Sequence, residues 1–174
     1  DLILLDAEQS KGAGRARNVG LEHAKGKWLL FADADDYYKQ GFIEILDEYR
    51  NKEIDVLYFN FERRDGQTNE LIKDLFWKKY VSDYDSSPEA TDLLKFRQNV
   101  PWSKMVSSNF IRKYHIKFAE VPNGNDVFFS MLVGYFSNII EVEKREIYVY
   151  LQNTNSIVTS KLSNKGRLCK LTKI

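Results

Sequence analysis

The chain has 174 residues, which is enough for one domain with a substantial hydrophobic core. Hydrophobic residues make up 43% of it and include 11 Phe, 10 Tyr and 3 Trp, a composition that excludes a disordered chain. The formal net charge of +1 provides no overall field that would attract nucleic acid or an acidic partner. No apolar run approaches the length of a membrane span, and the single cysteine, Cys169, permits no internal disulfide.

Strand and helix patterns alternate from the start of the chain. The apolar run 2–5 predicts a buried strand, and because the sequence opens inside this run we expect a chain truncated at its N-terminus. A polar, glycine-bearing loop over 6–14 leads to a helix over 16–24. The continuous apolar run 28–32 is typical of a strand buried on both faces.

The next predicted elements are a helix over 42–49 and a strand over 56–61. Strand, helix, strand, helix, strand is the order of an α/β layered fold with a largely parallel sheet. The mixed, charged stretch 63–98 indicates a variable excursion with helical pieces. The later part of the chain predicts helices over 109–114 and 126–136 and strands over 139–142 and 147–151.

Three aspartates are crowded into residues 33–36, directly after the buried strand. Ligands bind beyond the carboxyl ends of strands in open α/β sheets, and crowded carboxylates need a cation or hydrogen-bond donors. Oxygen ligands at this density suit Mg²⁺ or Mn²⁺, although a solvated turn that caps the next helix is the alternative. A calcium loop starting at Asp33 is excluded because Tyr38 stands where that loop requires glycine.

The stretch 11–18 carries two glycines ahead of a predicted helix. Glycines let backbone N–H groups approach a phosphate, and a helix N-terminus favours an anion. A plain connection is the more common meaning of such a loop, and the GK[ST] ending of a P-loop is absent.

Taken together, the glycine-bearing stretch 11–18 and the acidic stretch 33–36 point to a protein family far more specifically than either does alone. Residues 12–36 read G-x-G-x-A-R-N-x-G-x-x-x-A-x-G-x-x-x-x-F-x-D-x-D-D, which resembles the family-2 glycosyltransferases. Later segments resemble the same family: P-W-S-K over 101–104, I-K-F over 116–118, G-N-D-x-x-F over 124–129 and Y-V-Y over 148–150. The resemblance covers most of the chain, with 63–98 outside it.

The resemblance implies a GT-A-like fold that lacks its first strands. The chain would be one partial domain, with a donor- and metal-binding part over 1–62, an acceptor-side part over 63–160 and a basic tail over 161–174. In the family's sheet, two further strands separate the strand at 2–5 from that at 28–32. We therefore expect an open edge that pairs with a new neighbour or joins two copies as a homodimer.

The resemblance also implies roles for individual residues. Asp35 would ligate the divalent ion, and Asp33 would contact that ion or the ribose. Arg17 and Asn18 of the A-R-N motif would contact the donor. Asp126 would be the general base for the acceptor hydroxyl, whereas taken by itself it is an acid in the first turn of a helix.

Other positions leave alternatives open. Asp36 would support the site or the donor sugar. Asn125 stands where the family usually has Glu, which removes a charge beside the base. Trp102 and Lys104 would line the donor or acceptor pocket, or serve plain packing and a surface charge. His23 and His115 have no partner motif, so we expect ordinary histidines there.

The implied activity is an inverting, metal-dependent transfer of a sugar from a nucleotide-diphosphate donor to a hydroxyl of a carbohydrate or lipid-linked acceptor, in bacterial surface polysaccharide synthesis. A non-catalytic fragment of the same fold and a metal-dependent nucleotidyltransferase are the alternatives. The resemblance and the single cysteine indicate the cytoplasm. The basic tail would either touch anionic lipid at the inner face of the membrane or, as we favour, be solvated or continue into further sequence.

Overall fold

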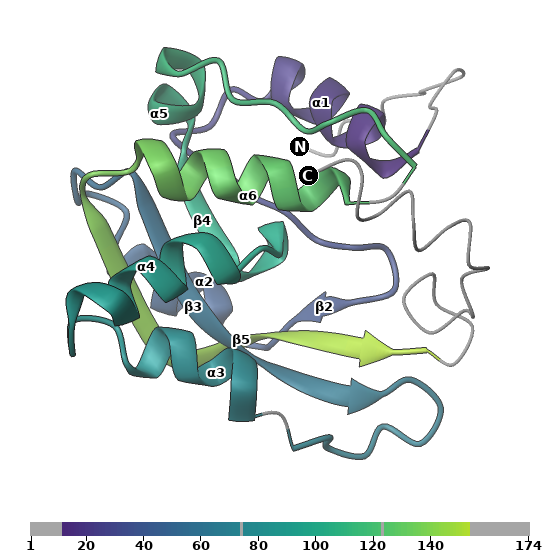
Figure 1. Ribbon diagram of the computed structural model, residues 1–174. Coiled ribbons are helices and arrows are strands. Elements are labelled where there is room, and N and C mark those ends of the chain that lie inside the picture. Colours follow the sequence, from purple (N-terminus) through teal and green to yellow (C-terminus); the bar gives the residue numbers. More distant parts are fainter. Residues whose placement is uncertain (1–11, 74, 123, 154–174) are drawn as a thin grey trace, which may run out of the picture.

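A five-stranded sheet organises the part of the chain that the computed structural model describes, residues 12–73, 75–122 and 124–153 (Figure 1). The strands are β1 (Trp28–Leu30), β2 (Tyr37–Tyr38), β3 (Val56–Asp65), β4 (Lys104–Ser107) and β5 (Ile140–Gln152). The helices are α1 (Ala13–His23), α2 (Phe42–Asp47), α3 (Leu75–Ser82), α4 (Pro88–Arg97), α5 (Ser108–Lys113) and α6 (Asn125–Phe136), with a 3₁₀ turn η1 over Pro101–Ser103.

The strands lie in the order β1-β4-β3-β5-β2. β3 and β5 pair in parallel, from Val56 opposite Ile140 to Asp65 opposite Gln152, with irregularities around Asn60. The other three pairs, β1–β4, β3–β4 and β2–β5, are antiparallel. The α/β class is confirmed, and the prediction of a largely parallel sheet holds for the long central ladder but not for the other pairs.

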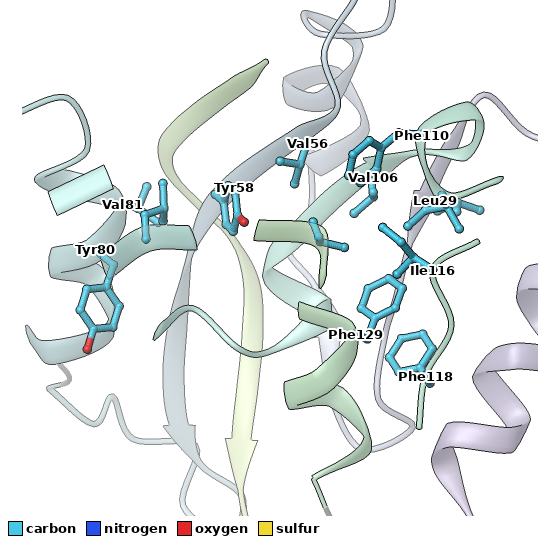
Figure 2. Packing of buried hydrophobic residues seen from close by; sticks show 13 residues of the cluster. Leu29, Val56, Tyr58, Tyr80, Val81, Val106, Phe110, Ile116, Phe118 and Phe129 are labelled. Atoms are coloured by element: carbon cyan, nitrogen blue, oxygen red, sulfur yellow. The ribbon is translucent and has the colours of Figure 1, made fainter. Parts of the chain in front are cut away.

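Two hydrophobic cores lie on opposite faces of the sheet, because successive side chains of a strand point to opposite faces. Val56 and Tyr58 of β3 belong to the core that α4, α5 and α6 cover, part of which Figure 2 shows. The alternate residue Leu57 belongs to the second core, which also contains Leu46 of α2. Figure 1 shows α4 and α6 in front of the sheet with α2 behind it, so the fold has three layers.

Predicted elements within the described residues are present, with two corrections. The strands predicted over 139–142 and 147–151 are one strand, β5. The charged residues between them suggested a break, but Glu143 accepts hydrogen bonds from the Tyr49 hydroxyl and from the backbone N–H of Arg145. Paired in this way, its carboxylate can be buried inside a continuous strand.

The second correction concerns the run 28–32, which was expected to be a strand buried on both faces. β1 ends at Leu30, whose side chain is 38% exposed, whereas Leu29 is buried. The reason is position: among the described strands β1 pairs only with β4 and forms the edge of the sheet. The strand predicted over 2–5 lies outside the described residues, so pairing at this edge stays a prediction.

The excursion 63–98 contains the end of β3 and the helices α3 and α4, in agreement with the helical pieces expected there. α4 begins at Pro88 after Ser87, whose hydroxyl accepts a hydrogen bond from the Ala90 N–H at 3.2 Å. Such a cap satisfies a backbone donor that the first turn leaves unpaired. Within the described residues, no helix combines the length and apolar character needed to cross a membrane.

The close contact between α4 and α6 supplies a test of the packing. A Cβ atom at Gly134 would lie 2.2 Å from the carbonyl oxygen of Lys95, so the two helices approach at a position that only glycine permits. We expect Gly134→Ala to lower the free energy of unfolding by about 1–3 kcal/mol through overpacking. Urea denaturation of the variant and the wild type measures this change in the free energy of unfolding.

Gly20→Ala is the matched control, because Gly20 lies in α1 and a Cβ there would meet nothing within 4 Å. Helix propensity then favours alanine by up to about 1 kcal/mol. Equal effects of the two substitutions would contradict the close approach of α4 and α6.

Candidate active site

The acidic turn, residues 33–36, follows β1 and is held by β5. The Tyr148 hydroxyl accepts a hydrogen bond from the Asp33 backbone N–H at 3.1 Å and donates one to Asp36 Oδ2 at 2.9 Å. The Leu151 N–H donates to Asp36 Oδ1 at 2.8 Å. Both carboxylate oxygens of Asp36 therefore have hydrogen-bond partners within the protein, and its role in the site stays a prediction.

Burial raises the pKa of Asp36 from 3.8 to about 6. The hydrogen bonds from Leu151 and Tyr148 oppose this shift, and the neighbouring Asp35 and Asp33 carboxylates add to it. Because a charge is costly where the group is partly desolvated, Asp36 keeps its proton to a higher pH than an ordinary aspartate does.

Asp33 and Asp35 point to different partners. Asp35 is exposed, and its Oδ2 accepts a hydrogen bond from Asn153 Nδ2 at 3.1 Å. Asp33 Oδ1 accepts a hydrogen bond from the Arg17 guanidinium. Their oxygens are ligands of the type that Mg²⁺ or Mn²⁺ prefers, and Asp35 has lone pairs open to solvent, so the residues fit such an ion. No group of three His, Cys, Asp or Glu side chains in the described ranges could hold a metal, so an ion at Asp35 would need ligand oxygens from other sources.

Arg17 and Asn18 lie on α1, facing the segment that precedes α6. The guanidinium of Arg17 also donates to Asn125 Oδ1 at 2.7 Å and lies over the Phe118 ring, 5.4 Å from its centroid. The buried Asn18 bonds the Phe118 backbone twice, accepting from N–H at 2.9 Å and donating to C=O at 3.0 Å. Asn18 thus holds the chain ahead of α6, and a donor contact for either residue stays a prediction.

Asp126 lies in the first turn of α6, whose N-cap residue is Gly124 with a φ of 75°. Its Oδ1 accepts a hydrogen bond from the Val127 N–H at 3.1 Å, and the side chain is only partly buried. Its neighbour Asn125 is bound by Arg17, and the role of Asp126 as the general base stays a prediction.

Trp102 packs inside the protein. Its ring stacks on Tyr148, with centroids 4.8 Å apart and planes 12° apart, and on Tyr150 at 5.6 Å and 10°. Only 5% of Trp102 is exposed. Trp102 thus packs against Tyr148, whose hydroxyl bonds both Asp33 and Asp36. A direct contact between Trp102 and a ligand stays a prediction.

Lys104 is fully buried, so the alternative of a surface charge is wrong. Its ammonium donates to the carbonyl oxygens of Gln98 at 2.5 Å and Val100 at 2.6 Å, and to the Ser130 hydroxyl at 3.3 Å. Burial lowers the pKa of Lys104 to about 7, and the Asp126 carboxylate opposes that shift. In this arrangement Lys104 joins the loop before η1 to α6.

Sequence reasoning gave no site role to Tyr148 or Asn153, or to the link between Arg17 and Asn125. Only the Y-V-Y pattern pointed toward Tyr148, and it named no partner. Of the histidines, His23 is exposed on α1 with Nδ1 2.9 Å from the Val19 carbonyl oxygen, as expected for an ordinary histidine.

The acidic turn follows the carboxyl end of β1, the position at which open α/β sheets commonly bind ligands. The family model "Glycosyl transferase family 2" matches residues 1–135, and the chain belongs to this family.

Relatives and solved structures agree. The chain is 24% identical over 157 residues to the putative glycosyltransferase EpsH of Bacillus subtilis, covering 87% of this chain and 45% of that protein. It is 27% identical over 148 residues to the poly(ribitol-phosphate) beta-N-acetylglucosaminyltransferase TarS of Staphylococcus aureus, covering 81% and 24%. The crystal structure of S. aureus TarS 1-349 in complex with UDP-GlcNAc superposes with a TM-score of 0.65 at 22% identity, covering 88% of this chain and 43% of that one. The GT-A-like fold is confirmed, and the chain spans less than half the length of these proteins.

The raised pKa of Asp36 predicts a pH dependence of stability. Because the folded state holds this proton more tightly than the unfolded state, Asp36 makes folding less favourable as pH rises from about 4 through about 6. We expect the free energy of unfolding of the wild type, minus that of Asp36→Asn, to fall across this window and to level off above it. Urea denaturation at stepped pH measures the difference, and a difference independent of pH would contradict the assignment.

Proposed function

We propose that this protein transfers a sugar, with inversion, from a nucleotide-diphosphate donor to a hydroxyl acceptor. The observation that carries the proposal is the link through Arg17, which bonds both Asp33 of the acidic turn and Asn125 beside Asp126. The link joins the proposed donor end of the site to the proposed base. Family membership and a related structure with UDP-GlcNAc support a nucleotide-sugar donor.

In the proposed mechanism, Asp126 accepts the proton of the acceptor hydroxyl as its oxygen attacks the anomeric carbon from the face opposite the departing diphosphate. One carboxylate suffices because the product is inverted in a single displacement, without a covalent sugar–protein bond. Asp35 and Asp33 would hold Mg²⁺ or Mn²⁺, which neutralises charge on the leaving diphosphate when bound. Asp36 and Tyr148 keep the turn in place.

For the acceptor, we propose a hydroxyl of a growing surface glycopolymer, carbohydrate or lipid-linked. Relatives include the "Minor teichoic acid biosynthesis protein GgaB" of B. subtilis and TarS, whose names refer to such polymers. The proposed location is the cytoplasm, at the inner face of the membrane where lipid-linked acceptors are available. Association through the open edge of β1 stays part of the proposal.

The base is tested by Asp126→Asn in the intact protein. The substitution keeps the shape of the side chain and removes its basicity, so kcat should fall by roughly 10²-fold or more. The donor KM should change little, because Asp126 does not bind the donor in this scheme. Turnover is measured with a panel of UDP-sugars and the matching acceptor.

Glu120→Gln is the companion variant, because Glu120 also lies near the start of α6 and accepts a hydrogen bond from Arg15 at 3.3 Å. We expect it to keep its turnover. Full activity of Asp126→Asn together with an inactive Glu120→Gln would move the base to Glu120.

The metal is tested by Asp35→Ala. Removing the exposed carboxylate should abolish Mn²⁺-stimulated transfer and weaken Mn²⁺ binding in the presence of UDP, measured by calorimetry. Circular dichroism should remain that of the wild type. Asp47→Ala is the control, because Asp47 is an exposed carboxylate of α2 paired with Arg50 at 3.2 Å. An Asp35→Ala protein that Mn²⁺ still activates would refute the assignment.

A further inference from the structure

The Arg17 side chain connects three elements that are distant in the sequence. It starts from α1, donates to Asp33 of the acidic turn and donates to Asn125 at the start of α6 at 2.7 Å. The Arg17 side chain is only 17% exposed, and Asn125 is buried. The Phe118 ring lies against the guanidinium, 5.4 Å from centroid to Cζ. Such packing restricts the rotamers of a long side chain, so the two bonds have a defined geometry.

The rest of α1 holds only one side of this junction. A Cβ atom at Gly14 would lie 2.3 Å from the Ala119 carbonyl oxygen and 3.0 Å from Asn125 Cβ, so α1 packs directly on the segment ahead of α6. Asn18 bonds the same segment through the Phe118 backbone. Among the described side chains of α1, Arg17 alone is hydrogen-bonded to the acidic turn, through Asp33.

We propose that Arg17, acting through Asn125, is a positioning residue that fixes the spacing between Asp33 and Asp126. The inference rests on the proposed function, since it assigns Asp33 to the donor end and Asp126 to the acceptor hydroxyl. Acceptor attack requires the base and the anomeric carbon to be aligned, and a misplacement of about 1 Å costs up to about 10²-fold in rate.

The chemistry of the two partners explains why arginine suits this position. Its guanidinium is a rigid planar fork that donates to two acceptors at once, whereas a lysine ammonium is a point charge on a flexible stem. Asp33 supplies the negative charge that balances the guanidinium. Asn125 contributes a neutral amide oxygen, which gives direction without a second carboxylate competing for the cation.

Arg15, also on α1, lies in a much more exposed place than Arg17. Arg15 pairs with Glu120 at 3.3 Å, and both side chains are 46% exposed. Exposed ion pairs of this kind contribute little and tolerate a change of cation. Arg15→Lys is therefore a control matched in substitution, in helix and in charge.

The test compares Arg17→Lys, Asn125→Ala and the double variant in the intact protein, with UDP-sugar transfer as the assay and the folded fraction measured by denaturation. We expect each single variant to lower kcat by about 10-fold with the donor KM within about twofold. The double variant should be no slower than the worse single one, because both changes break the same link. Arg17→Gln serves in place of Arg17→Lys if that protein does not fold.

The outcomes separate the possibilities. An Arg17→Lys protein with wild-type kcat would overturn the positioning role, because charge alone would then suffice. A raised donor KM with unchanged kcat would overturn it in favour of direct donor binding by Arg17, and additive losses would show that the two side chains act independently. A wild type that binds UDP but transfers no sugar would overturn the proposed function itself, and the positioning role with it.

Discussion

The parallel ladder between β3 and β5 is the constraint on which the rest of this structure depends. It is the longest pairing in the described chain, and each of its strands carries a further neighbour, β4 on one side and β2 on the other. β3 divides its side chains between the two cores, so the layers above and below the sheet are set by one strand. β5 in turn carries Tyr148 and Leu151, the groups that hold the acidic turn.

The charged groups near the site are each stabilised by specific partners, because burying an isolated charge is far more costly than burying a paired one. Asp36 receives two hydrogen bonds and still keeps a raised pKa. Lys104 lies among carbonyl and hydroxyl oxygens. Asp35 differs, since it stays exposed with one amide partner. Within the acidic turn, the most exposed carboxylate is thus Asp35, the one that the family resemblance assigns first to a metal ion.

β1 is the edge strand of the described sheet, on the side where the acidic turn begins. β1 delivers the acidic turn to the carboxyl end of the sheet, yet its outer side has no partner among the described strands. A small hollow of about 270 Å³ lies beside it, lined by residues of α1 and β1 that include Arg17 and Leu30. Arg17 of α1 therefore lines the hollow beside β1 and also donates a hydrogen bond to Asn125 of α6.

The sequence by itself determined the class of fold, the helices α1, α2, α5 and α6, and the identity of Asp33, Asp35 and Asp126 as candidates. The helices follow from local periodicity, and the three aspartates follow from short motifs whose combination resembles the family-2 glycosyltransferases. It did not determine that β5 is continuous, that β1 is an edge strand or that Lys104 is buried. Each of these depends on which distant segment packs alongside: Tyr49 against Glu143, β4 against β1, and the Gln98 carbonyl against Lys104. Only the tertiary structure joined Arg17 to Asn125, because a hydrogen bond across that separation in the chain leaves no local pattern.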